Sequence, residues 1–431
     1  MNLKSFGKRA LKCCLTLLAS ILAGILLMTC VYMLPTGRML TQADRSLPIF
    51  ENEGTSFCWA PEEKSARLDG YTDAIMLQTA VYVRDENPLK AAMRSARMEF
   101  SEGKLDPSGS LKQYVYGDRS GHVVSYARYW HGYLLFLKPL LLFFSLSDIR
   151  MMNAALQLIL AAGVLLLAFR KRGLRLALPM GLALLVINPI STALSMQFSS
   201  IYYLTLLGLL AMLLTESWDK PWGYLVFLFL GIGTAFFDFL TYPACAVGVC
   251  LALQALMSRA DGKTRVLKAI GSGAAWAFGY GGMWSGKWLA ASLITGTNVL
   301  RDAVEQAQYR SGGEVTAAEG GVSATFSAVI GRNLGVLVNP AAAIIVLVLL
   351  GVLVWLLVTK RCRFAIEKAS LLSLAIAFAV PFVWYFLVRN HSMVHCWMTY
   401  RNLAASVFAL SGFVCFGLKG KGSPEGGMSS T

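Results

Sequence analysis

The sequence predicts an all-α polytopic membrane protein with about ten transmembrane helices and a long first extracytoplasmic loop. Hydrophobic residues make up 56% of the 431 residues and charged residues only 15%, which is too apolar for a soluble multidomain protein. Apolar segments long enough to span a bilayer recur between short polar links. Links rich in Lys and Arg alternate with links that are not, as the positive-inside rule requires of cytoplasmic and outer loops.

The first apolar run, at about 13–34, follows a basic N-terminal segment. It has the length of a span and no convincing small-residue cleavage site, so we expect an uncleaved helix with a cytoplasmic N-terminus. A polar loop without a span follows. The expected organisation is 1–34 (cytoplasmic N-terminus and first span), 35–148 (first extracytoplasmic loop with juxtamembrane helices), 149–418 (nine-span transmembrane domain) and 419–431 (cytoplasmic tail).

The stretch from Arg128 to Arg150 decides the topology, because it is apolar enough to be read as a span. If it crossed the bilayer, the basic cluster at 170–175 would lie outside, against the positive-inside rule. Lys138 at the bilayer centre would also cost about 2.5–3.5 kcal/mol. We therefore expect a helix from Trp130 to about Leu146 that lies along the outer surface.

The later part of the chain consists of apolar segments with short links, and both termini are expected in the cytoplasm. A longer polar stretch at 295–339 is expected to be an outer link, and no internal repeat of the kind found in inverted-repeat transporters is present. The remaining spans are predicted at about 149–169, 176–194, 200–215, 222–238, 241–257, 269–290, 338–358, 369–388 and 400–418.

The excess of positive charge lies in the cytoplasmic links, so the net charge of +15 indicates orientation in the membrane and not nucleic-acid binding. Some of this charge also favours anionic membrane lipid. Histidines and ionisable residues at span ends gather on the opposite, outer side, where we expect the chemistry. They are His122, His131, His391, His395, Asp238, Lys287, Arg389 and Arg401.

Two carboxylates of the first loop are candidate catalytic bases. Thr72 is expected to cap a helix that begins near Asp73, which gives Asp73 a structural explanation and leaves Asp69 free. A carboxylate beside a partly desolvated membrane surface has a raised pKa and can take a proton from an alcohol. Asp69 is therefore the first candidate and Asp73 the second, while Asp85 and Glu86 precede Asn-Pro and are more typical of a turn.

Basic and aromatic residues on the same side suit a lipid phosphate or a sugar. Arginine binds phosphate with two parallel hydrogen bonds, lysine and histidine supply further donors, and aromatic rings either anchor the membrane interface or stack on a sugar. The candidates are Arg128, Tyr129, Trp130, His131, Lys138, Arg150, Asp238, Tyr242, Lys287, His391, His395 and Arg401.

The spacing of the two late histidines and the surroundings of Asp238 indicate their roles more closely. His391 and His395 fall on one helical face, but without an HExxH pattern phosphate or hydroxyl binding is favoured over metal, and a divalent metal stays open as a cofactor. Asp238 lies between two phenylalanines in the turn DFLTYP, where a buried acid needs a partner. We expect that partner to be one of the arginines on this side, which Asp238 would orient.

This plan resembles the GT-C superfamily of membrane glycosyltransferases, particularly the branch of protein O-mannosyltransferases and lipid A aminoarabinose transferases. The resemblance rests on Asp69 in LDGYTDAIML, on the segment WHGYLLFLKPLLLFFSLSDIRMMNAALQ with its Lys138-Pro139 and Arg150, and on DFLTYP. It covers the topology of about the first 260 residues. DGYTD stands where the family usually has an adjacent Asp-Glu pair, and the WWD motif of oligosaccharyltransferases is absent.

The resemblance implies a bacterial cell-envelope enzyme that takes a sugar from a polyprenyl-phosphate donor and inverts its configuration. Asp69 would deprotonate the hydroxyl of an unidentified acceptor, and the basic residues would stabilise the departing lipid phosphate. A transporter or flippase for a lipid-linked precursor is the alternative from another class, although it would favour ionisable residues deep within spans. An envelope polymerase or ligase is a further alternative, but such enzymes usually carry their largest outer loop late in the chain.

Overall fold

The computed structural model describes residues 3–83, 86–100, 106–338, 355, 358–359 and 362–420. It is mostly helical, which confirms the coarse fold class. Within these ranges, four helices are long and apolar enough to cross a membrane. They are α1 (Leu3–Tyr32, apolar over Gly7–Tyr32), α7 (Leu146–Arg172), α10 (Met196–Thr215) and α17 (Lys368–Leu387).

Shorter or less apolar helices occupy most of the other predicted spans. The span predicted at 338–358 lies almost entirely outside the described residues, so the count of ten remains a prediction. The expectation of a polar link at 295–339 is wrong for α15, an apolar helix that buries Val329 and Val336. The helices in predicted spans are α8 (Leu174–Val186), α11 (Tyr224–Phe237), α12 (Ala244–Met257), α13 (Gly262–Thr295) and α20 (Ala404–Gly417), while α15 (Phe326–Leu337) lies in the predicted link.

The span predicted at 176–194 is not one helix. α8 ends at Val186, and α9 (Pro189–Leu194) begins after Asn188, whose φ of 61° lies in the left-handed region. Proline disfavours the helical conformation of the residue before it and has no N–H for the preceding turn. The Asn188 side chain accepts the N–H of Ser191 at 3.1 Å and so caps α9.

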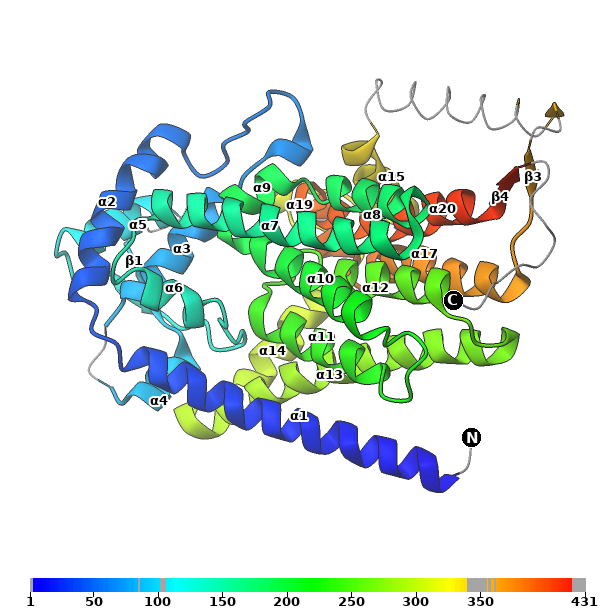
Figure 1. The fold of residues 1–431 in the computed structure, drawn as a ribbon. Coiled ribbons are helices and arrows are strands. Elements are labelled where there is room, and N and C mark those ends of the chain that lie inside the picture. Colours follow the sequence, from blue (N-terminus) through cyan, green and yellow to red (C-terminus); the bar gives the residue numbers. More distant parts are fainter. Residues whose placement is uncertain are drawn as a thin grey trace.

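Residues between α1 and α7 form a small compact layer. In Figure 1 these elements, blue to cyan, lie at one end of the helical bundle, where α7 begins, and the start of α1 lies at the other end. β1 and β2 pair antiparallel, with Met98 opposite Val123. The elements are α2 (Gly37–Glu53), η1 (Lys64–Ala66), α3 (Gly70–Val81), α4 (Pro88–Arg94), β1 (Arg97–Glu99), α5 (Pro107–Val115), β2 (His122–Val124) and α6 (Leu134–Leu140).

The predicted helix from Trp130 to about Leu146 is wrong in extent, because only α6 is helical there. His131 has a φ of 56°, and the N–H of Gly132 donates to the carbonyl of Phe236 at 2.9 Å, so the chain before α6 is held on the end of α11. α7 then starts at Leu146, close to the predicted 149. Its start is fixed by a capping box in which Ser145 and Asp148 bond each other's backbone N–H.

The remaining elements connect the later helices. β3 and β4 pair antiparallel with Arg363 opposite Lys419. α18 packs against both α14 and α15, which brings the 299–337 segment onto the link between α17 and α20. These elements are α14 (Val299–Ser311), η2 (Ala317–Glu319), β3 (Cys362–Phe364), α18 (Arg389–Val394), α19 (Cys396–Thr399), η3 (Tyr400–Leu403) and β4 (Leu418–Gly420).

Small residues let α11 and α13 approach closely. A Cβ on Gly231 would lie 2.1 Å from the carbonyl oxygen of Trp276, and one on Gly279 would lie 2.5 Å from that of Leu228. The two glycines thus face the opposite backbone reciprocally, as in the small-residue interfaces of membrane helices. This packing places Asp238 of the α11–α12 turn near Tyr280 of α13.

We predict that Gly231→Ala destabilises the protein by about 1–3 kcal/mol, the usual cost of overpacking, because the obstructing atom belongs to a backbone and cannot rotate away. Gly163→Ala is the matched control, since a Cβ there meets nothing within 4 Å. Unfolding of the purified protein in mixed micelles by increasing SDS measures both. Equal stability of the two variants would contradict this account of the α11–α13 contact.

Candidate active site

Asp69 is the N-cap residue of α3, so the expected cap by Thr72 is wrong. Its Oδ1 accepts the N–H of Thr72 at 3.1 Å, and its own N–H donates to Ser195 Oγ at 2.9 Å. The residue is 4% exposed, and its Oδ2 has no hydrogen-bond partner within the described residues. Because buried carboxylate oxygens are normally hydrogen-bonded, Oδ2 is the atom at which this group could accept a proton.

Asp73 lies one turn further along α3 and is fully buried. Its Oδ1 accepts the N–H of Met196 at 3.0 Å, and its Oδ2 lies 3.7 Å from Nη2 of Arg150. Met196 is the first residue of α10, and the preceding Ser195 makes no side-chain cap of its own. Asp73 therefore caps α10 from a neighbouring helix, which is a structural role.

Arg150, a candidate phosphate ligand, joins two carboxylates. Its Nη1 lies 2.9 Å from both oxygens of Glu53 on α2, and its Nη2 faces Asp73 on α3. The guanidinium group thereby ties the start of α7 to both helices of the first loop. Ser195 and Glu53 complete this arrangement, and neither could be identified from the sequence, because their partners lie 126 and 97 residues away.

Two arginines supply positive charge around Asp69. Arg67 lies two residues before it, with its guanidinium 4.3 Å from the ring centroid of Trp397, and Arg401 is fully buried 4.2 Å from the ring centroid of Phe198. Both attract the Asp69 carboxylate electrostatically. Arg401 was a predicted site residue, whereas Arg67 and Trp397 were missed. The only sequence signal for Arg67 was its place next to Asp69.

Burial raises the pKa of both aspartates. For Asp69, loss of solvent outweighs the hydrogen bonds from Thr72 and the charges of Arg67 and Arg401, so its pKa lies above the ordinary 3.8. For Asp73, burial is the largest cause and the negative charge of Asp69 adds to it, against the lowering effect of Arg150, and the pKa rises to about 7. The two acids therefore share one buried site, where their charges disfavour each other.

The DFLTYP turn brings several predicted residues together, but among the residues that the structure describes Asp238 pairs with no arginine, contrary to expectation. Its Oδ2 accepts the N–H of Thr241 at 2.9 Å and its Oδ1 accepts the Thr241 hydroxyl, so it folds the turn. Burial raises the pKa of Asp238 to about 7. Tyr242 is fully buried, donates its hydroxyl to the carbonyl of Phe198, and places its ring 5.8 Å from the Arg401 guanidinium.

His391 and His395 lie side by side on the far side of this turn, with ring centroids 4.7 Å apart. Nε2 of His391 donates to the carbonyl of Leu240 at 2.6 Å, which leaves its buried Nδ1 without a partner in the described structure. Across the described residues, no group of three or more His, Cys, Asp or Glu is arranged to hold a metal. His122 does not join this pair. It is exposed on β2, where its Nε2 lies 3.7 Å from Oε2 of Glu99.

The predicted aromatic residues of the first loop pack on the DFLTYP turn. Phe239 contacts the rings of Tyr129 at 5.2 Å and His131 at 5.0 Å. Nε2 of His131 bonds the carbonyl of Tyr126 at 2.9 Å, and Trp130 donates its indole N–H to the carbonyl of Met283 at 2.8 Å. These contacts give the rings a structural function. A role in stacking on a sugar stays a prediction.

The two predicted lysines donate hydrogen bonds to carbonyls at the C-terminal ends of helices. Nζ of Lys138 donates to the carbonyl of Ala80 in the last turn of α3 at 2.7 Å. Nζ of Lys287 donates to the carbonyl of Met93 in the last turn of α4 at 3.0 Å. Cations at helix C-termini satisfy otherwise unpaired carbonyls and the helix dipole. Arg128, in turn, pairs with Asp302 of α14 at 2.8 Å. Phosphate binding by these three side chains remains a prediction.

These residues define a buried acid held where α3 meets α10, with two arginines nearby. Comparison of the chain with models of protein families, with curated proteins and with solved structures finds no match. The site's chemistry therefore has to be argued from its own residues. Asp85, a lesser candidate, lies outside the described residues, and the neighbouring Glu86 forms an ion pair with Arg94.

We predict that Asp73→Ala lowers stability by about 1–2 kcal/mol, because α10 loses its cap and Arg150 loses one of its two carboxylates. Asp69→Asn keeps the carbonyl oxygen that accepts the Thr72 N–H and is expected to stay within about 0.5 kcal/mol of the wild type. SDS-titrated unfolding of both variants provides the comparison. If Asp69→Asn were the more destabilised of the two, the structural role assigned to Asp73 would be wrong.

Proposed function

We propose that the protein is a polytopic membrane glycosyltransferase that moves a sugar from a polyprenyl-phosphate donor to an acceptor hydroxyl at the extracytoplasmic face. In this proposal both termini are cytoplasmic and the first loop lies outside. The four membrane-length helices and the compact layer between α1 and α7 are compatible with that arrangement. A divalent metal is not needed for the step described below.

The observation that carries the proposal is the unpaired Oδ2 of Asp69. A general base needs a carboxylate with a free oxygen, a raised pKa and a fixed position. Asp69 has one oxygen that caps α3 and one without a partner, burial raises its pKa, and Ser195 fixes its backbone. Asp73 also caps a helix with one oxygen and leaves the other without a hydrogen bond within the described residues, but that second oxygen lies 3.7 Å from Nη2 of Arg150, whose charge holds it.

The proposed reaction is a single displacement at the anomeric carbon. The acceptor oxygen forms a bond to that carbon while the bond from carbon to the phosphate oxygen breaks, so the configuration inverts. The acceptor proton passes to Oδ2 of Asp69, and the electron pair of the broken bond stays on the polyprenyl phosphate. Positive charge at Arg67 and Arg401 favours that developing anion, because a preorganised cation costs no reorganisation during the step.

The test follows release of polyprenyl phosphate from a panel of polyprenyl-phosphate sugars by the purified protein. We expect release by the wild type and a loss of about 10²–10⁴-fold in Asp69→Asn, the range that general-base catalysis contributes. Asp73→Asn is the matched control and is expected to retain much more activity. Equal rates for the wild type and Asp69→Asn would remove the assignment of the base.

A second outcome would favour the alternative class. Binding of the lipid-linked sugars without any release of polyprenyl phosphate would indicate a transporter or flippase. Transport across proteoliposomes would then be the deciding measurement, and Asp69 would be expected to act in substrate binding.

The pH dependence gives a separate prediction. A base works only when ionised, so the rate should rise with pH as Asp69 loses its proton and level off above its pKa. Because burial raises that pKa, the midpoint should lie above 3.8, the ordinary value for an aspartate. The residual rate of Asp69→Asn should lack this limb. A midpoint at or below the ordinary value would show that a different group titrates.

A further inference from the structure

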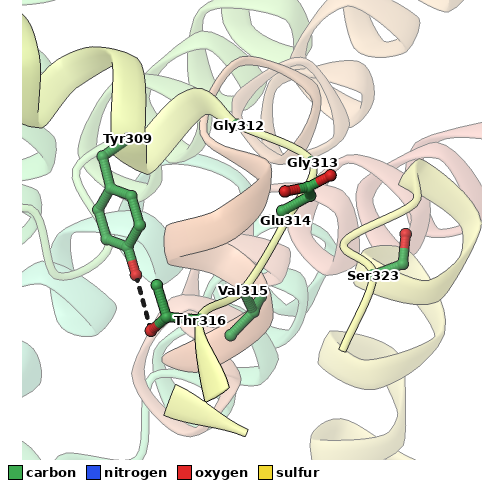
Figure 2. A pocket seen from close by; sticks show the side chains of 7 residues that line it. All are labelled: Tyr309, Gly312, Gly313, Glu314, Val315, Thr316 and Ser323. Carbon is green, nitrogen blue, oxygen red and sulfur yellow. Dashed lines mark hydrogen bonds between the residues drawn. The ribbon is translucent and has the colours of Figure 1, made fainter. Parts of the chain in front are cut away.

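A hollow with a mixed polar and apolar lining opens in the segment that follows α14. It has a volume of about 690 Å³ and lies between the end of α14 and the strand-like bridge that joins Glu314 to Ser323. Figure 2 shows the Tyr309 ring, with its hydroxyl beside Thr316, on one side and Ser323 on the other. The lining residues are Tyr309, Gly312, Gly313, Glu314, Val315, Thr316 and Ser323.

The residues that line the hollow indicate which class of ligand it could bind. It offers three hydroxyls, one carboxylate and the backbone of two glycines, with Val315 as its one aliphatic side chain. Within the described residues, Glu314 pairs with no cation and its side chain is exposed. A free carboxylate repels phosphate. The apolar part of the lining comes from single groups such as Val315 and the Tyr309 ring and forms no continuous wall for a lipid chain. Carboxylates and hydroxyls next to an aromatic ring are suited to the hydroxyl groups and ring faces of a neutral carbohydrate.

The backbone around the hollow is hydrogen-bonded to α18, and the helix that follows it contacts η1, which precedes Asp69 in the chain. The backbone N–H of Asn390 donates to the carbonyl of Gly312 at 3.1 Å, and its side-chain amide donates to that of Glu314 at 2.8 Å. Tyr309 donates to Glu319 at 2.5 Å. α15, which follows directly, packs against η1. The carbonyl of Ser65 in η1 accepts from Arg401 at 3.4 Å, and η1 ends three residues before Asp69.

We propose that this hollow is a carbohydrate-binding site and that it holds the acceptor, so that the acceptor of the proposed transferase is a glycan. The assignment of the bound glycan as acceptor rests on the proposed function, whereas binding of carbohydrate does not. Glu314 accepts hydrogen bonds from two neighbouring sugar hydroxyls, Tyr309 packs against a ring face, and Thr316 and Ser323 bond the remaining hydroxyls. The repulsion between Glu314 and phosphate keeps the lipid-linked donor out of this subsite.

The test measures binding and needs no catalysis. The full-length protein is placed in lipid nanodiscs, because the sugar headgroups of common detergents would compete, and titrated with mannotriose, maltotriose and chitotriose. Saturation-transfer NMR and calorimetry report the affinities. At least one trisaccharide should bind, and Glu314→Gln should weaken it about tenfold or more, as expected for loss of hydrogen bonds to a charged group. Ser323→Ala should weaken it less.

One control variant keeps the outcomes distinct. Glu305→Gln removes an exposed carboxylate of α14 that pairs with Arg301 and does not line the hollow, and it should leave affinity unchanged. Failure of all three sugars to bind, or equal affinity of Glu314→Gln and Glu305→Gln, would overturn this site. Sugar binding together with transfer to a peptide or a lipid would overturn its role as acceptor site while leaving the glycosyltransferase in place.

Discussion

The side chain of Asp73 is the constraint on which the arrangement of the site depends. A carboxylate buried without solvent must be neutralised by charge or by hydrogen bonds, and here both are supplied by other elements. Met196 brings the start of α10 and Arg150 brings the start of α7, while Glu53 attaches α2 to the same guanidinium. Four helices from distant parts of the sequence therefore begin or end around one side chain, and Asp69 is held beside it.

The same rule explains why so many predicted ligands turned out to have structural partners. Lys138 and Lys287 each meet the unpaired carbonyls of a helix end, and Asp238 folds its own turn through Thr241. In each case a polar group that could have met a ligand instead satisfies a backbone group that would otherwise be buried unpaired. The candidates that remain are buried polar atoms without a hydrogen-bond partner among the described residues, and Oδ2 of Asp69 is one of them.

The sequence predicted the helical class and the approximate positions of α1, α7, α10 and α17, because hydropathy is a local signal. The structure places the predicted Arg401 where its charge attracts the Asp69 carboxylate, and the role of Asp69 as a base stays a prediction. The sequence did not predict the break at Asn188, the short α6, or the capping of α10 by Asp73, since these depend on partners distant in the chain. The helix-end partners of Lys138 and Lys287 were not predicted, because a sequence does not reveal which carbonyl a lysine will reach.

A division of labour between the two aspartates follows from their positions one turn apart. Asp73 has the structural role, and the negative charge of Asp69 adds to the raised pKa of Asp73. Asp69 is held in place by its hydrogen bonds with Thr72 and Ser195, and burial raises its own pKa. Rigidity keeps a base aligned with its substrate, and a raised pKa strengthens its affinity for a proton. The Asp73 oxygen that does not cap α10 faces Arg150, whereas Oδ2 of Asp69 has neither a hydrogen bond nor an ion pair within the described residues, which is a physical reason for this segment to carry two acids.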